Sequence, residues 1–167
     1  TPVHILPADT WSYYSATVSR GYVPPLEVWD SNLLPHADAL GCSAAVIVDY
    51  TQGGIYHAPD YQDAVARAAR ANGALWIADE VVTGIGRAGR WFAFQGGKAR
   101  PDIVTLGQAL GGGSLPVAAV VVSRSVPEAM RGASWQNYGP LRGHPLPVAA
   151  RACLHGSGHW NRSTGRH

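Results

Sequence analysis

The spacing of apolar residues changes period along the middle of the chain, and this change predicts the order of the elements. Residues 43–49 form a short apolar, β-branched run, which is typical of a strand buried on both faces. Over residues 60–71 the apolar positions recur at helical spacing, with Gln62 and Asp63 on the polar side. Residues 74–78 form a second apolar run. Strand, helix and strand with short connections predict a βαβ crossover, so we expect the two strands to be parallel neighbours.

Two more strands and two helices are predicted further along the chain. Residues 102–106 and residues 117–122 are apolar runs that a triple-glycine segment separates. Ser125 is expected to cap a short helix that runs to residue 130, and residues 146–154 also have a helical pattern. These elements predict an α/β fold with a mainly parallel sheet and covering helices.

The two ends of the chain lack this periodicity. Residues 1–40 are rich in proline and aromatic side chains, and we expect an irregular lead-in that wraps a core. Residues 155–167 consist mostly of Gly, Ser, His, Asn and Arg, and we expect a disordered or foreign tail. The α/β unit then occupies residues 41–154. Because the sequence starts at Thr1 without Met or a signal-peptide pattern, we expect a fragment or a processed chain.

Composition limits the classes of function. The 167 residues are 46% hydrophobic, enough for one domain with a core. A net charge of +2 with scattered arginines predicts no nucleic-acid partner. No window has the roughly 18 apolar residues of a membrane span, so we expect no membrane partner. Cys42 and Cys153 are isolated in the sequence, so we expect no disulfide scaffold or zinc site and a reducing cytoplasm. His155 and His159 have no third ligand beside them, so we expect no metal there either.

Two glycine-rich runs match nucleotide-binding loops only in part. Residues 84–89 match G-x-G-x-x-G, but they do not follow a strand directly and no helix pattern comes after them. Residues 111–113 lack the Lys-Ser/Thr of a P-loop. Asp79 and Glu80 end a strand, at the edge where ligands bind in open α/β sheets. Because neighbouring strand residues point to opposite faces, we expect one carboxylate in a cleft and the other on a structural partner.

The most specific signal is a continuous motif over residues 78–119, which begins Ala-Asp-Glu-Val-Val-Thr-Gly and includes Leu-Gly-Gln-Ala-Leu-Gly-Gly-Gly. Residues 45–53 contain the end of the first predicted strand and the Gln-Gly pair that follows it at residues 52–53. Residues 142–145 are Arg-Gly-His-Pro. Together these segments resemble class III aminotransferases, which are pyridoxal-phosphate (PLP) enzymes of fold type I. The resemblance implies part of the large domain of that fold and an ancestral PLP-dependent amino-group transfer. It also implies small-molecule amine or keto substrates and a homodimer.

The resemblance assigns roles to single residues. Asp79 corresponds to the aspartate that bonds the pyridine nitrogen of PLP and keeps it protonated, so that the ring can accept electrons. Val81 corresponds to the apolar residue on the ring face, and Gln52 is a further cofactor-binding position. The Schiff-base lysine corresponds to Gln108, and the phosphate-binding threonine corresponds to Pro140.

These two replacements remove chemistry that the family uses. The Gln108 amide cannot form an imine with the cofactor aldehyde or act as the base that moves a proton. Pro140 offers neither a hydroxyl nor an N–H to a phosphate. Lys98, the single lysine, lies in a polar loop where we expect it to be solvated. The family's earlier half of the large domain and its C-terminal small domain also have no counterpart here.

We therefore expect an aminotransferase-like chain that does not transaminate by itself. One alternative is a repurposed cofactor-independent enzyme that uses the old pocket. Another is a non-catalytic dimerising partner or a degraded remnant. In each case we expect Asp49, Asp79 and Gln108 to converge on one concave face, with Asp79 partly buried, because parallel strands end at a common edge.

Overall fold

The computed structural model describes residues 3–6, 26–28, 43–50, 59–129, 131 and 143–156. The strands are β1 (Val3–Leu6), β2 (Leu26–Val28), β3 (Ala45–Asp49), β4 (Leu75–Asp79), β5 (Ile103–Leu106) and β6 (Ala119–Val122). The helices are α3 (Pro59–Ala71), α4 (Ser125–Ala129) and α5 (Pro145–Gly156), with short 3-10 turns η3 (Ala93–Gly96) and η4 (Gln108–Gly111).

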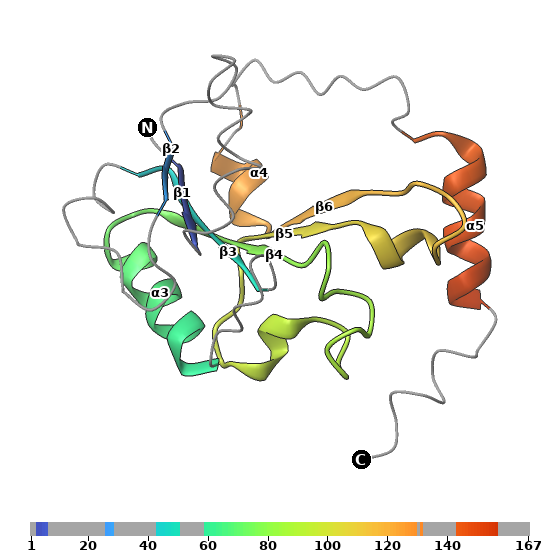
Figure 1. Cartoon of the computed structure of the whole chain (residues 1–167). Helices are drawn as coiled ribbons and strands as arrows, with labels where there is room; N and C mark the ends of the chain where they lie inside the picture. The colour runs from blue at the N-terminus through green and yellow to red at the C-terminus, as the bar shows by residue number, and fades with distance from the viewer. Residues whose placement is uncertain are drawn as a thin grey trace.

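Within the described residues the strands form a six-stranded sheet in the order β2-β1-β3-β4-β5-β6 (Figure 1). Every neighbouring pair is parallel except β5 and β6, which are antiparallel. Strands β3 and β4 are parallel neighbours joined through α3, which confirms the predicted βαβ crossover. Asp49 and Asp79 are register partners at the carboxyl ends of these two strands.

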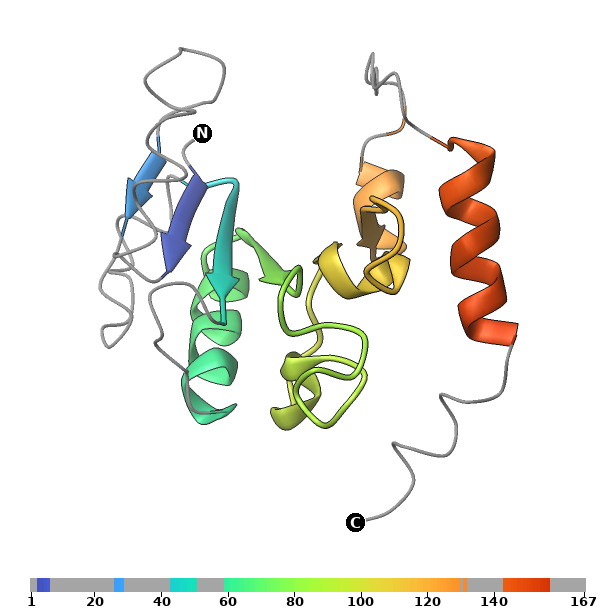
Figure 2. The same ribbon diagram turned by 45° about the vertical axis from the view of Figure 1, so that its right-hand side comes forward.

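The core lies between the centre of the sheet and α3. The side chains of Val46, Val48, Val65 and Trp76 are completely buried there. Burying a side chain of this size stabilises the fold by roughly 1.5–3 kcal/mol, so this interface provides much of the folding energy. Helix α5 lies at the opposite end of the molecule from β1 and β2 and contacts η4 (Figure 2).

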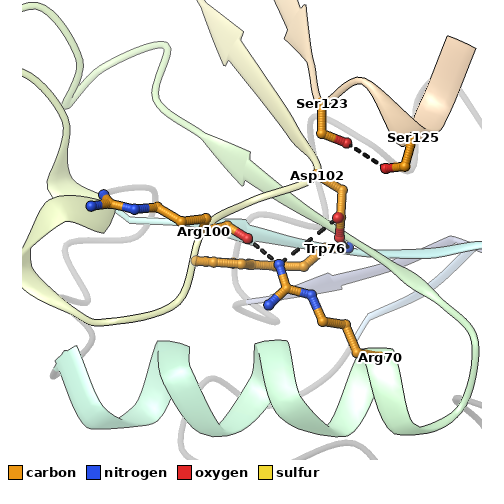
Figure 3. A network of polar contacts seen from close by, with 6 residues as sticks. All are labelled: Arg70, Trp76, Arg100, Asp102, Ser123 and Ser125. Atoms are coloured by element: carbon orange, nitrogen blue, oxygen red, sulfur yellow. Dashed lines mark hydrogen bonds and ion pairs between the residues drawn. The ribbon is translucent and has the colours of Figure 1, made fainter.

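Asp102, the residue before β5, connects the helix layer to the sheet. Its carboxylate accepts a hydrogen bond from the Trp76 backbone N–H at 2.9 Å and lies 3.8 Å from the Arg70 guanidinium (Figure 3). Arg70 also donates to the Arg100 carbonyl. Because Arg70 is half exposed, we ascribe to this ion pair less than about 1 kcal/mol of stability and mainly a positioning role for the start of β5.

Three expectations need correction. Residues 1–40 are not irregular throughout, because β1 and β2 lie there and pair with each other, and β1 with β3; the other residues of this lead-in lie outside the described part of the chain. Runs of three or four residues carry too little periodicity to be recognised, and their pairing partners are distant in sequence. The tail does not begin at residue 155, since α5 extends to Gly156. Gln62 and Asp63, assigned to the polar side of the helix, are buried.

Candidate functional site

The carboxylate of Asp79 is fixed at the carboxyl edge of the sheet. Its Oδ1 atom accepts hydrogen bonds from the Thr105 hydroxyl at 2.9 Å and from the Val81 backbone N–H at 3.1 Å. Thr105 faces Asp79 because the two residues are register partners in β4 and β5. Asp79 is partly buried, as expected. Thr105 was missed in the sequence, where only the pairing of β4 with β5 could have placed it beside Asp79.

The Val81 side chain lies close to the backbone of Gly107, the residue before Gln108. A Cβ atom on Gly107 would come within 3.1 Å of Val81 Cγ1, so the glycine lets the chain pass close to the valine. Two elements that are separated in sequence, the turn after β4 and the start of η4, are therefore in contact here. This places Val81 between the Asp79 carboxylate and the backbone at residue 107.

Gln108 begins η4 with an unusual backbone conformation and an exposed side chain. Its φ angle is +30°, in the left-handed region that non-glycine residues rarely adopt. It lines a cavity of about 400 Å³ together with Arg87, Ala109, Gly112 and Gly113. Backbone conformations of this kind cost roughly 1–3 kcal/mol and persist where the surroundings impose them, often at binding sites.

The two aspartates are neighbours at the carboxyl edge of the sheet, and their convergence with Gln108 on one concave face stays a prediction. Asp49 and Asp79 lie side by side at one sheet edge, and Asp49 is almost completely buried. Neither aspartate lines the cavity beside Gln108, within the part of the chain that the structure describes. Gln52 and Pro140 lie outside the described residues.

Glu80 is the carboxylate with structural partners, of the two at the end of β4 for which the alternation predicted one such environment. It is 1% exposed and accepts hydrogen bonds from the Thr83 hydroxyl at 2.5 Å, the Ala93 N–H at 2.9 Å and the Phe94 N–H at 2.8 Å. Burial raises the pKa of the Glu80 carboxyl, and the bonds from Thr83 and Phe94 oppose this shift. Glu80 thus anchors the glycine-rich turn and η3 to the end of β4.

A second buried polar group supports the neighbouring turn. The Tyr50 hydroxyl donates to Gln62 Oε1 at 2.6 Å, and Gln62 Nε2 donates to the Phe94 carbonyl at 3.0 Å. Burial raises the pKa of the Tyr50 hydroxyl, so it stays a donor. Gln62 is buried for this reason, because its amide links the end of β3 to η3.

Lys98 is exposed, and its backbone N–H, rather than its amine, is held by Asp63. No group of three or more His, Cys, Asp or Glu side chains that could hold a metal occurs among the described residues. Within the same residues, no helix has the length and apolar character needed to cross a membrane.

A mainly parallel sheet with an aspartate at its carboxyl edge, and a glycine-flanked turn after the next strand, fits the fold of a PLP-dependent transferase. The chain belongs to the class III aminotransferase family, whose sequence model matches residues 39–154.

Among its relatives, ornithine aminotransferase 2 from Staphylococcus aureus is 35% identical over 144 residues, which are 81% of this chain and 36% of the relative. An S-selective transaminase from Arthrobacter sp. is 30% identical with a TM-score of 0.66, and the match covers 87% of this chain and 29% of that one. An ornithine aminotransferase from Toxoplasma gondii shares the fold, with a TM-score of 0.72 at 23% identity over 91% of this chain and 39% of that one. This confirms the expected α/β fold of type I. The chain spans about a third of the length of the first of these relatives.

The residues of the site fit one part of PLP and not another. A carboxylate such as Asp79, held by Thr105 and the backbone, is the group that pairs with a protonated pyridine nitrogen. Gln108, which follows Gly107, has an amide side chain. Covalent attachment of the PLP aldehyde needs an amine. Lys98 is exposed in the loop that Asp63 binds.

Proposed function

We propose that this chain is a class III aminotransferase relative that does not catalyse amino-group transfer by itself. The observation that carries the proposal is Gln108, an amide at the start of η4 in a strained backbone conformation, at the position of the family's Schiff-base lysine. An amide nitrogen is not nucleophilic and does not accept a proton near neutral pH, so neither covalent attachment nor proton transfer is available there. Pro140 in place of the phosphate-binding threonine supports the same conclusion.

The proposal keeps the rest of the family's site. Asp79 and Val81 would bind the pyridine ring of PLP non-covalently, with Gln52 as a further contact. When PLP is bound, its ring supplies the electron sink of the family's chemistry. We extend the family's small-molecule amine or keto ligands, its homodimer and a cytoplasmic location to this chain as part of the proposal.

Borohydride reduction tests the proposal directly. Purified protein is incubated with PLP, its visible absorbance is recorded, and the sample is reduced and mapped by peptide mass spectrometry. We expect no imine absorbance and no adduct at residue 108. Gln108→Lys is the matched variant, and labelling of that variant alone would show that the position faces the cofactor. An adduct on Lys98 of the unmodified chain, or turnover of an amine and a keto acid, would contradict the proposal.

One second candidate is a cofactor-independent enzyme that uses the old cofactor pocket, which the carboxylate of Asp79, held by Thr105 and the Val81 N–H at the sheet edge, favours. Such an enzyme would turn over a small substrate without PLP, and Asp79→Ala would abolish that turnover. Turnover of a small substrate without PLP would support this second candidate. Absence of any turnover would support the first proposal, a pseudoenzyme of the aminotransferase family.

A further inference from the structure

We propose that Thr105 is a positioning residue, whose hydroxyl holds the Asp79 carboxylate in the orientation that pairs with a protonated pyridine nitrogen. This role rests on the proposed function, because it concerns the non-covalent ring site that the chain is proposed to keep. It goes beyond the aminotransferase resemblance, which gives position 105 no role. The ligand concerned is a small molecule with a protonated pyridine ring.

Thr105 is the polar residue of an otherwise apolar strand. Strand β5 has the sequence Ile-Val-Thr-Leu, and its threonine is partly buried. A hydroxyl that loses contact with water costs stability unless it finds a hydrogen-bond partner. Valine has nearly the same shape, favours a strand equally and carries no such cost. The strand therefore has a donor where packing requires only an apolar side chain, and this donor meets the carboxylate of Asp79.

The backbone of Thr105 is fixed by the strands on both sides of it. Thr105 is the register partner of Asp79 in β4 and of Val120 in β6. Its carbonyl accepts a hydrogen bond from the Glu80 N–H at 3.0 Å. Because threonine is β-branched, its side chain also has few conformations in a strand. Strand pairing therefore directs the hydroxyl at Asp79 before any ligand binds.

Two donors from different elements meet the same oxygen of Asp79. The Thr105 hydroxyl lies 2.9 Å and the Val81 N–H 3.1 Å from Oδ1. The Val81 bond is local, since it joins residues two positions apart, whereas the Thr105 bond ties the carboxylate to the neighbouring strand. A carboxylate that is held in one orientation binds a cation without first losing rotational freedom. Removal of the hydroxyl would leave the local bond from Val81 to hold Oδ1.

The neighbouring carboxylate has a hydroxyl partner of the same kind but a different environment. The Thr83 hydroxyl donates to Glu80 at 2.5 Å, and Glu80 also accepts two backbone N–H groups and is 1% exposed. That bond serves the fold, because Glu80 is shut off from solvent. Asp79 is partly exposed at the sheet edge. Thr83→Val is therefore a matched control, which removes the same type of bond from the structural carboxylate.

The test is the binding of pyridoxine to the full chain, followed by the NMR amide signal of Val81. Pyridoxine has the pyridine ring but neither the aldehyde nor the phosphate, so its binding needs no amine at residue 108 and no hydroxyl at residue 140. The second probe is a benzene analogue with the same substituents, in which C–H replaces the ring nitrogen. The variants are Thr105→Val, Thr105→Ser, which retains a hydroxyl, and Thr83→Val. Urea unfolding establishes that each variant is folded.

We expect Thr105→Val to weaken pyridoxine binding about tenfold, because a hydrogen bond to a charged group contributes on this scale. The same variant should bind the benzene analogue no more weakly than the unmodified chain does, since the hydroxyl acts through the contact with the ring nitrogen. Thr105→Ser and Thr83→Val should keep their affinity for pyridoxine within about twofold.

Unchanged pyridoxine binding in Thr105→Val overturns the role of Thr105 and leaves the ring site standing. Equal weakening of both probes, or equal weakening by Thr83→Val, also overturns it, because either result shows a general effect on the fold. If pyridoxine does not bind to the unmodified chain, the role of Thr105 and the proposed ring site are both wrong. The proposed loss of transamination is then unaffected, since borohydride reduction tests it separately.

Discussion

The Asp63 carboxylate accepts hydrogen bonds from the Lys98 backbone N–H at 3.0 and 2.9 Å, although the two residues are 35 positions apart. The next N–H, of Ala99, donates to the same carboxylate at 2.8 Å. A helix residue thereby holds the loop that leads into β5, and β5 supplies the Thr105 hydroxyl that fixes Asp79. The position of the candidate site thus depends on a carboxylate outside it.

Asp63→Ala is expected to lower the free energy of unfolding by about 2 kcal/mol, because the two backbone donors lose a charged acceptor. The hydrogen bond from Ala99 lowers the pKa of the Asp63 carboxyl. A lowered folded-state pKa gives stability that is present above about pH 3.9 and is lost as the pH falls through the folded-state value. Urea unfolding at several pH values measures this. An Asp63→Asn variant with the same acid sensitivity as the unmodified protein would contradict it.

Glu80→Gln is expected to destabilise the protein by about 1–3 kcal/mol despite its matching shape. Glu80 now accepts hydrogen bonds from the Thr83 hydroxyl and from the N–H groups of Ala93 and Phe94. The glutamine NH₂ group would face at least one of these three donors and could not accept its hydrogen bond. Since the folded-state pKa is raised, the contribution of protonated Glu80 is fully present below about pH 4.3 and is lost as the pH rises through the folded-state value. The cost of the substitution should therefore be larger near pH 4 than near pH 7 in chemical denaturation. An exposed control, Glu128→Gln, should change stability by less than about 0.5 kcal/mol.

Gly97→Ala is expected to loosen the contact between α3 and the loop before β5. The new Cβ atom would overlap Gln62 Nε2 and lie 2.6 Å from Asp63 Oδ1, and both partners are buried and hydrogen-bonded. Gly96→Ala is the matched control, because its Cβ atom would meet Pro59 Cγ at an ordinary 3.6 Å. We expect a loss of about 1–3 kcal/mol for the first variant only, measured by thermal unfolding. Similar melting temperatures for the two variants would show that the loop shifts freely.

Gln108→Lys is expected to restore little transamination, although it returns an amine to the family's position. The variant leaves Pro140 at the position of the family's phosphate-binding threonine, so the phosphate of PLP would still lack that hydroxyl. The measurement is single-turnover conversion of PLP with an amine donor. Robust turnover by this single variant would show that the rest of the site is complete.

The sequence by itself determined the βαβ unit of β3, α3 and β4, the strands β5 and β6, and the family to which the chain belongs. These elements carry strong local signals, namely apolar runs bounded by glycine and a helical period, and a motif that extends over residues 78–119. The alternation along β4 also predicted that one of the carboxylates of Asp79 and Glu80 would find structural partners, without deciding which of the two it would be.

Only the tertiary structure decided which polar residues are buried and which donors meet them. Gln62 and Asp63 occupy the polar side of a helical pattern, yet both are buried because Tyr50, Phe94 and the loop at Lys98 approach them from distant parts of the chain. Thr105 reaches Asp79 through strand pairing, and Arg87 shares a cavity with Gln108 through the folding of two turns. Periodicity reports the environment that a residue has along its own element. Contacts between elements depend on register and on loop paths, which no local pattern encodes.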